Sequence, residues 1–360
     1  AVLYSFFTIL LINDMIYIIY MKRIYLILLF SLSFATIITV DDDGPADYSI
    51  IQDAIDVSVD GDTVLVHRGF YQENLLVDKS ITLASYAIYD SLSNLESWIN
   101  YDVEYYVIND SINETIIDGS TPSDTDYGSC VVIHNQYNCI TPTVMGFTIQ
   151  NGIGTEVIRN PGTNIEQTQV LGGGLLVSSA SDPAIHYNRI INNGSTGDTY
   201  SGGGIYLSSE PEDFGFDNRS FDSDREDCDV TEFDVSNNYY DNNQADYGNT
   251  LANRYYENQY NMRESIFDKA NCSADEISPV WVYVESDAQI DISNSVANQC
   301  SVPDSDVYVD PNIDQECMID GCGQENTPFK TIVRALEMIL PSESNPVTIH
   351  LAEGTYSPDT

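Results

Sequence analysis

A glycine-led block occurs twice in this chain and constrains its fold more than any other feature. The stretch GGGLLVSS at 172–179 returns as GGGIYLSS at 202–209. A repeat built on a short apolar strand predicts stacked coils, each of which buries the apolar side of its neighbour. Glycine runs supply corners where a Cβ does not fit. The six glycines are Gly172, Gly173, Gly174, Gly202, Gly203 and Gly204.

An asparagine pattern, Asn-x-apolar-x-Asn, accompanies the glycine blocks. In stacked coils, equivalent positions lie above one another, so these asparagines are expected to form columns at the corners. Asparagine tolerates the left-handed backbone of a sharp corner, and its amide can bond to the next coil. The pairs are Asn188 and Asn192, Asn238 and Asn242, and Asn294 and Asn298.

The first part of the repeat region contains short apolar strands separated by Gly, Asp, Asn and Ser, which is typical of an all-β chain. Residues 49–58 are the exception, because Ile51, Ala54 and Ile55 recur at helical spacing. Ser49 and Gln52 fit a capping box at the start of this helix. The segment 307–356 restates this opening, with Ile332, Ala335 and Leu336 as a matching apolar face.

The amino end is expected to lie outside the fold. Met21-Lys22-Arg23, an apolar stretch and small residues before an expected cleavage after Ala35 form a secretory signal. Residues 1–20 are therefore expected to be an over-extension of the sequence upstream of the true start. Two membrane helices are the alternative. We expect a signal at 21–35, a coil module at 36–302 and the start of a second, truncated module at 303–360. The mature chain is expected to have no membrane span, and the native polypeptide to continue.

Acidic residues dominate the charge. Against 13 Lys and Arg there are 56 Asp and Glu, a net charge of -43. Such a surface repels phosphates, which argues against a nucleic-acid partner. Divalent cations suit it better, and calcium is the candidate cofactor, because acidic turns supply the oxygens it needs. A solvated acidic turn is the alternative. The candidate ligands around the turn at Gly44 are Asp41, Asp42, Asp43 and Asp47.

Several segments carry a family resemblance. They are VDDDGP at 40–45, IQDAI at 51–55, GFYQEN at 69–74, KSITL at 79–83, TIIDG at 115–119, GFTIQNG at 146–152 and both glycine blocks. With them the chain resembles right-handed parallel β-helix proteins of the pectin-lyase-like superfamily, specifically the carbohydrate-binding and sugar-hydrolysis repeats of bacterial surface proteins. The resemblance implies an all-β, right-handed parallel β-helix with a short N-terminal capping helix, and a polysaccharide groove along one sheet.

The catalytic sets of that superfamily are not found in the sequence. The chain has no Gly-His-Gly and no Arg-x-Lys, and its four histidines are not at metal-ligand spacing. We therefore predict no catalytic residue. The candidate sugar-binding residues are Tyr206, Tyr239 and Tyr240, whose rings could stack on sugars if exposed, and Arg189, a basic residue inside a coil.

The combined prediction is a secreted or bacterial cell-surface protein. It would act as an adhesin, a glycan-binding module or a scaffold without catalysis of its own. The alternative is a polysaccharide-acting enzyme, that is, a lyase, esterase or hydrolase. An acidic cluster or an arginine on the exposed face of one parallel sheet would favour the enzyme. Aromatic or asparagine ladders on that face would favour binding.

Overall fold

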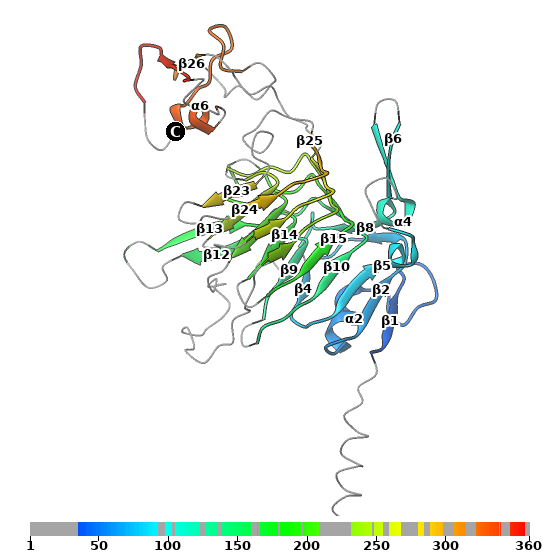
Figure 1. Ribbon diagram of the computed structural model, residues 1–360. Helices are drawn as coiled ribbons and strands as arrows, with labels where there is room; N and C mark the ends of the chain where they lie inside the picture. Colours follow the sequence, from blue (N-terminus) through cyan, green and yellow to red (C-terminus); the bar gives the residue numbers. More distant parts are fainter. Residues whose placement is uncertain are drawn as a thin grey trace, which may run out of the picture. The chain divides into compact units, whose positions relative to one another are not determined.

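The computed structural model of the chain is mostly β, with long parallel sheets and few, short helices (Figure 1). The predicted segment 1–20 and nearly all of the predicted signal lie outside the described residues, as do Asn298 and the acidic stretch 209–231. The structure describes residues 35–92, 98–102, 105–122, 127–135, 138–159, 164, 166–178, 181–195, 197–208, 232–246, 248–254, 259–267, 280–283, 289–297, 306–313, 322–337, 339 and 346–356.

Within the described residues, three long parallel sheets, named A, B and C, contain eight, seven and six strands. Sheet A consists of β1 (Ile37–Val40), β2 (Thr63–Val66), β5 (Thr82–Ser85), β10 (Thr143–Met145), β15 (Ala184–His186), β18 (Glu232–Asp234), β21 (Gln259–Asn261) and β24 (Gln289–Asp291). Sheet B consists of β3 (Gly69–Tyr71), β8 (Thr115–Asp118), β11 (Thr148–Gln150), β16 (Arg189–Ile191), β19 (Tyr239–Asp241), β22 (Ile266–Phe267) and β25 (Val296–Ala297). Sheet C consists of β4 (Leu75–Val77), β9 (Val131–Ile133), β14 (Leu175–Val177), β17 (Ile205–Ser208), β20 (Leu251–Arg254) and β23 (Val280–Tyr283).

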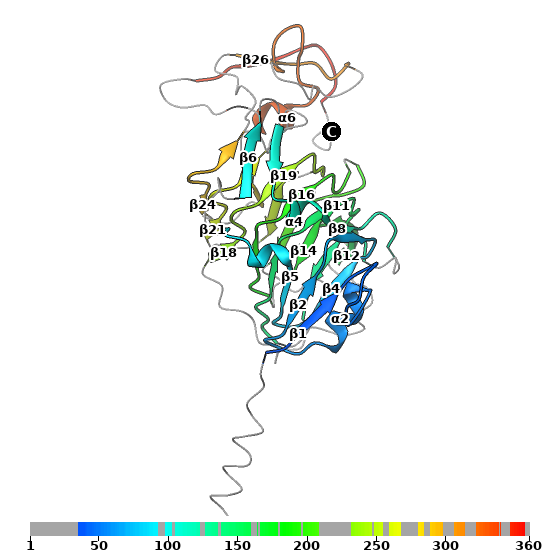
Figure 2. The ribbon, with the colours of Figure 1, turned by 90° about the vertical axis from the view of Figure 1, so that its right-hand side faces the viewer.

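The chain visits sheets A, B and C in turn and then returns to A, so each strand pairs with the strand one circuit earlier or later. The two glycine blocks illustrate this, because Leu175 of β14 pairs in register with Ile205 of β17. Buried apolar side chains from strands of all three sheets form a single core cluster. Figure 2 shows β19, β16, β11 and β8 of sheet B side by side.

A buried amide ladder runs along the corner between sheets A and B. The Asn188 side-chain oxygen accepts from the Phe147 N–H at 3.1 Å, and the Asn238 oxygen accepts from the Asn188 N–H at 2.9 Å. The ladder then continues through the hydroxyls of Ser265 and Ser295, at 3.1 and 3.0 Å. Asn294 is therefore not a ladder residue. It occupies the preceding corner position, which has left-handed backbone (φ 60°).

The corner after sheet B carries a second ladder. Asn192 and Asn242 adopt left-handed backbone, with φ of 55° and 50°, and their side chains bond at 2.7 Å on the surface. The following residues, Asn193 and Asn243, are buried, and the Asn193 N–H donates to the Asn243 side-chain oxygen at 3.1 Å. The backbone of Gly173 passes close to this corner: a Cβ there would lie 2.5 Å from the N atom of Gly194.

Helix α2 (Ile51–Val57) buries Ile51, Ala54 and Ile55 in the main core. The predicted capping box is absent, because no side chain next to the helix start caps it. Glu73 takes this role from a distant part of the chain, and its carboxylate accepts from the N–H groups of Ile51 and Gln52 at 2.8 and 3.0 Å. A carboxylate at a helix N-terminus also complements the helix dipole.

The outer faces of sheets B and C are partly covered. On sheet B, a cluster joins Ile191 and Tyr239 to Trp98 and Ile112 of an excursion between β5 and β8. That excursion contains η1 (Tyr86–Tyr89), the antiparallel pair β6 (Ile99–Asp102) and β7 (Tyr105–Ile108), and α4 (Asp110–Asn113). On sheet C, Leu176 and Tyr206 pack with Val157 and Leu171 of the antiparallel pair β12 (Thr155–Arg159) and β13 (Gln167–Leu171).

The segment 306–356 has its own core, which includes Val307, Phe329 and Ala335. It contains β26 (Val307–Val309), α6 (Ile332–Glu337) and β27 (Ile349–Leu351), and its two strands pair in parallel. Among the residues described, no helix has the length and apolar character needed to span a bilayer.

Candidate functional site

Polar and aromatic groups gather along sheet A, on the side away from the core and at the carboxyl ends of its strands. Core residues such as Val64 and Ile185 alternate with outward-facing ones, so His186 at the end of β15 points away from the core. His67 immediately follows β2, and Tyr86 immediately follows β5. Because these strands are parallel, their carboxyl ends meet along one edge, which we call the A edge.

Three aromatic side chains, His67, Tyr86 and Tyr89, lie at the first rungs of the A edge with successive rings tilted by 50° and 58°, and we call them the aromatic stack. The rings of His67 and Tyr86 have centroids 4.3 Å apart, and those of Tyr86 and Tyr89 are 5.7 Å apart. The Tyr86 hydroxyl and the His67 Nε2 share a hydrogen bond of 2.9 Å. Tyr89 is 63% exposed and Phe70, on β3, is 51% exposed. Tyr89 and Phe70 therefore present aromatic surface to solvent beside the half-buried rings of His67 and Tyr86.

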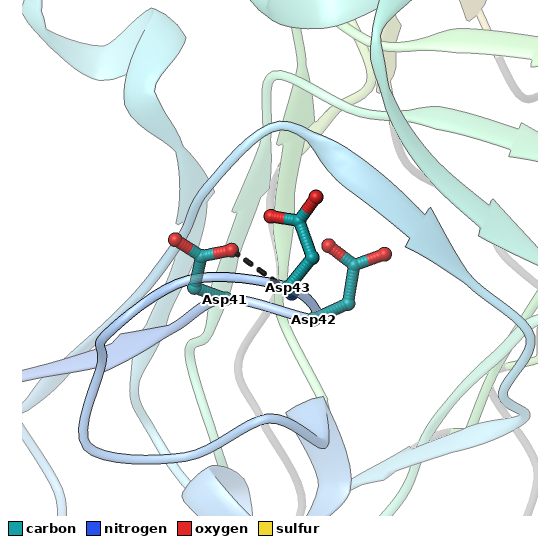
Figure 3. Close-up of side chains that lie close together, drawn as sticks. All are labelled: Asp41, Asp42 and Asp43. Atoms are coloured by element: carbon teal, nitrogen blue, oxygen red, sulfur yellow. Dashed lines mark hydrogen bonds between the residues drawn. The ribbon is translucent and has the colours of Figure 1, made fainter.

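An acidic turn lies beside this stack. Asp41, Asp42 and Asp43 follow β1, and one carboxylate oxygen from each lies within 4.8 Å of the others (Figure 3). The turn is held by its own side chains, because the Asp41 Oδ1 accepts from the N–H of Gly44 at 3.0 Å. The Asp41 Oδ2 lies 3.7 Å from the His67 Nδ1, which joins the turn to the aromatic stack.

The fourth predicted calcium ligand, Asp47, is not part of this group. Its Oδ2 accepts from both the N–H and the hydroxyl of Thr39, at 2.9 and 2.8 Å. These hydrogen bonds lower the pKa of Asp47 below its ordinary value. The Asp42 Oδ2 is likewise engaged, by the N–H of Phe70 at 3.0 Å. Calcium takes six to eight oxygens, so three partly engaged carboxylates supply only part of its shell.

A second polar cluster lies further along sheet A, around Arg263. Its guanidinium is 3.7 Å from a Glu232 oxygen and 3.6 Å from an Asp291 oxygen. The Arg263 Nε also donates to the side-chain oxygen of Asn261 at 2.8 Å. The Asn261 amide in turn donates to Asp234 at 3.2 Å. One cation thus lies among several carboxylates on one sheet face.

Two acids in this region titrate in opposite directions. Burial alone would raise the pKa of Asp234, but the His186 ring 3.9 Å away and the hydrogen bonds from Ser236 outweigh it and lower that pKa. Asp182 has no such compensation, and burial raises its pKa. Asp182 lies two residues before Ala184, which pairs with Asp234 across β15 and β18. The carboxyl of Asp182 therefore holds a proton more readily than that of Asp234.

The structure buries the three tyrosines predicted to bind sugar, which contradicts the exposure that stacking on a sugar requires. Tyr206 is 2% exposed under the β12–β13 pair, and Tyr239 is 7% exposed under the excursion on sheet B. Tyr240 points into the main core, where its ring stacks on Phe267 at 5.4 Å. Burial raises the pKa of the Tyr240 hydroxyl.

Arg189 lies on β16 of sheet B, half-buried, and not on the A edge. Burial lowers the pKa of its guanidinium, while Tyr239 and Asp241 oppose that shift. The Arg189 N–H donates to the Phe147 carbonyl at 2.8 Å. Arg189 therefore lies on sheet B beside Tyr239 and is not part of the aromatic stack on the A edge.

The residues of the A edge were missed in the sequence for an identifiable reason. His67 and Tyr86 are separated by one circuit of the chain, and Arg263 and Asp291 by another, so no local motif joins them. The signal that could have found them was the strand ends: His67 and Tyr86 directly follow strands, Asp291 closes one, and Arg263 lies two residues beyond one.

No protein-family model and no curated protein sequence matches the chain. Among solved structures, one with similarity is a pectin methylesterase mutant in complex with a hexasaccharide, at 11% identity over 86% of this chain and 96% of that chain. Its TM-score is 0.32. At that score the likeness adds nothing to the assignment of fold or activity.

Proposed function

We propose that the chain is an exported, right-handed parallel β-helix that binds glycans at the A edge, as part of a secreted or cell-surface protein. In this proposal α2 caps the first coil of the helix. The circuit through sheets A, B and C and the shared core support the fold. The observation that carries the binding function is the aromatic stack, in which the exposed ring of Tyr89 contacts the half-buried ring of Tyr86, which in turn contacts half-buried His67.

The chemistry of the stack favours a neutral glycan. Tyrosine rings provide large, rigid contact area for the apolar faces of sugars and lose little conformational entropy on binding. Asp41, Asp42 and Asp43 offer acceptors for sugar hydroxyls close by. The same carboxylates repel uronates, and the net charge of -43 adds to that repulsion. Calcium on the acidic turn would reduce it.

Calorimetric titration of the full chain with neutral and uronic-acid oligosaccharides, with and without calcium, tests this proposal. We expect Tyr89→Ala to weaken binding of a neutral oligosaccharide about tenfold, since one stacked ring contributes roughly 0.5–1.5 kcal/mol beyond its buried area. Tyr89→Phe keeps the ring and should bind as the parent does. Tyr200→Ala, at another exposed tyrosine, is the matched control. Equal losses in Tyr89→Ala and Tyr200→Ala would reject the stack as the binding surface.

The Arg263 cluster favours a second candidate, a polysaccharide-acting enzyme. Arg263 lies beside Glu232 and Asp291 and is linked to Asp234 through Asn261, so it can orient an acidic or polar substrate close to carboxylates. Release of new reducing ends from a panel of polysaccharides measures this activity. Release that Asp234→Asn and Arg263→Gln both abolish would establish the enzyme. No release by the folded chain from any member would leave binding as the function, with ester cleavage then assayed separately.

A further inference from the structure

The segment 306–356 repeats the opening of the chain in three dimensions as well as in sequence. Strand β1, helix α2 and strand β2 correspond in order to β26, α6 and β27. Both strand pairs are parallel, and Ile38 pairs with Val64 as Val307 pairs with Ile349. This register equates Val66 with Leu351.

The loops of the two segments are bonded alike. The Asp41 N–H donates to the Tyr48 carbonyl at 3.0 Å, and the Asp310 N–H donates to the Phe329 carbonyl at 2.8 Å. Tyrosines close both segments in the same way. The Tyr71 hydroxyl donates to the His67 carbonyl at 3.0 Å, and the Tyr356 hydroxyl to the Ala352 carbonyl at 2.7 Å. The two segments are therefore copies of one building unit. We call residues 37–71 the first unit and the described residues of 306–356 the second unit.

The copies differ in how their apolar groups are covered. Val66 and Ile55 are completely buried in the first unit. Their counterparts in the second unit, Leu351 and Leu336, are 51% and 57% exposed. Among the residues that the structure describes, the second unit thus has core-type residues at core positions without the cover that the first unit has.

In the first unit, the next coil provides that cover. Strand β5 pairs with the free side of β2, placing Leu83 beside Val64 and Ser85 beside Val66. Leu75 and Val77 of β4 join the same core as α2. In the second unit, within the described residues, β27 pairs only with β26, so its other edge is open. An open parallel edge with apolar flanks is a template for strand addition.

We propose that the open edge of β27, with Leu336 and Leu351, is a docking surface for a further parallel β-coil of the kind formed by residues 72–85. The occupant is an extended segment with apolar residues at alternate positions, which adds its strand to β27 and covers both leucines. This proposal is independent of glycan binding, since none of its residues belongs to the A edge.

The test keeps the chain intact through Tyr356 and appends a second copy of residues 72–85, the segment that follows Tyr71, the counterpart of Tyr356. Tethering keeps the local concentration of the probe high. Hydrogen–deuterium exchange read by mass spectrometry should show the amides of β27 exchanging at least tenfold more slowly than in the unextended full chain. Exchange in β8 and β11 should not change, because the probe is a local addition.

Two controls separate docking from a general effect of the added residues. In the first, Leu75→Asp and Leu83→Asp in the appended copy replace its inward side chains. In the second, Leu351→Asp alters the docking surface of the extended chain. Both should exchange at β27 as fast as the unextended chain does. The proposal would be overturned if β27 in the chain with the unsubstituted extension exchanged within twofold of the unextended chain, or if either control slowed exchange equally.

Discussion

The side-chain oxygen of Asn238 accepts a hydrogen bond from the backbone N–H of Asn188 at 2.9 Å, one circuit away along the chain. The Asn238 amide also donates to the carbonyls of Ile185 and Val235, at 2.7 and 2.9 Å. All these groups are buried, so no water can replace a lost partner. Asn238 therefore ties consecutive circuits together at the corner between sheets A and B.

We expect Asn238→Ala to lower the free energy of unfolding by about 2–4 kcal/mol. The substitution leaves a buried N–H and two buried carbonyls without this partner, and each unsatisfied group costs roughly 1–3 kcal/mol before relaxation. Urea unfolding followed by circular dichroism measures the effect. The control is Asn242→Gly, at an exposed corner where glycine accepts the left-handed backbone, and it should change stability by less than about 0.5 kcal/mol. Comparable losses in the two variants would show that the buried ladder has no special role.

Gly173 marks a close approach between circuits, and Gly173→Ala tests it. A Cβ at this position would lie 2.4 Å from the Gly203 carbonyl oxygen, which is backbone and cannot rotate away. We expect a loss of about 3 kcal/mol, typical of a severe overpacking. Gly197→Ala is the comparison: its backbone is left-handed (φ 88°), but nothing lies within 4 Å of the added Cβ. It should cost about 1 kcal/mol from backbone strain alone. Thermal and urea unfolding that ranks Gly197→Ala as the worse variant would contradict the packing argument.

The parallel sheets could be predicted from the sequence because stacking turns a one-dimensional repeat into a three-dimensional column. The corner residues were only partly readable. Asn192 and Asn242 stood out at regular spacing, whereas their neighbours Asn193 and Asn243, which form the buried rungs, did not enter the pattern. Asn294 fitted the spacing but lies one position before the ladder.

Exposure could not be read from the repeat. Tyr206 and Tyr239 lie on strands as predicted, yet segments outside the repeat cover them, namely the β12–β13 pair and the excursion that contains Trp98. The cap of α2 was missed for a similar reason. Glu73, which accepts a hydrogen bond from the Ile51 N–H, is 22 residues away in the sequence. Such contacts join residues that are far apart in the sequence and have no local signature.

Asp118 should make stability depend on pH in the acid range. Burial alone would raise its pKa, but hydrogen bonds from Ser120, Gln150 and Asn151 outweigh it and hold that pKa below the ordinary 3.8. The unfolded chain therefore takes up the proton more readily than the folded chain. The stabilisation is fully present above pH 3.8 and is lost as the pH falls through the folded value.

Asp118→Asn should remove this part of the pH dependence. Measured by urea unfolding between pH 6 and 3, the free energy of unfolding of the parent should fall more steeply toward low pH than that of the variant. Asp53→Asn, at an exposed position of α2, should retain the parent slope. Parallel curves for the parent and Asp118→Asn would mean that this carboxylate does not contribute to acid sensitivity.

Cys130 should be inert to alkylation while the chain is folded. Its thiol is free and buried, and its Sγ donates to the Gln150 carbonyl at 3.1 Å. Burial raises its pKa to about 12, so the reactive thiolate is roughly one part in ten thousand at pH 8. Iodoacetamide at pH 8 should leave the Cys130 peptide unmodified in buffer and alkylate it rapidly in concentrated urea, as peptide mass spectrometry will show. Cys139 and Cys322, which are in disulfides, should stay blocked in both conditions without reductant. Alkylation of Cys130 in buffer at a rate within tenfold of that in urea would show that the core beneath β9 opens far more readily than its packing indicates.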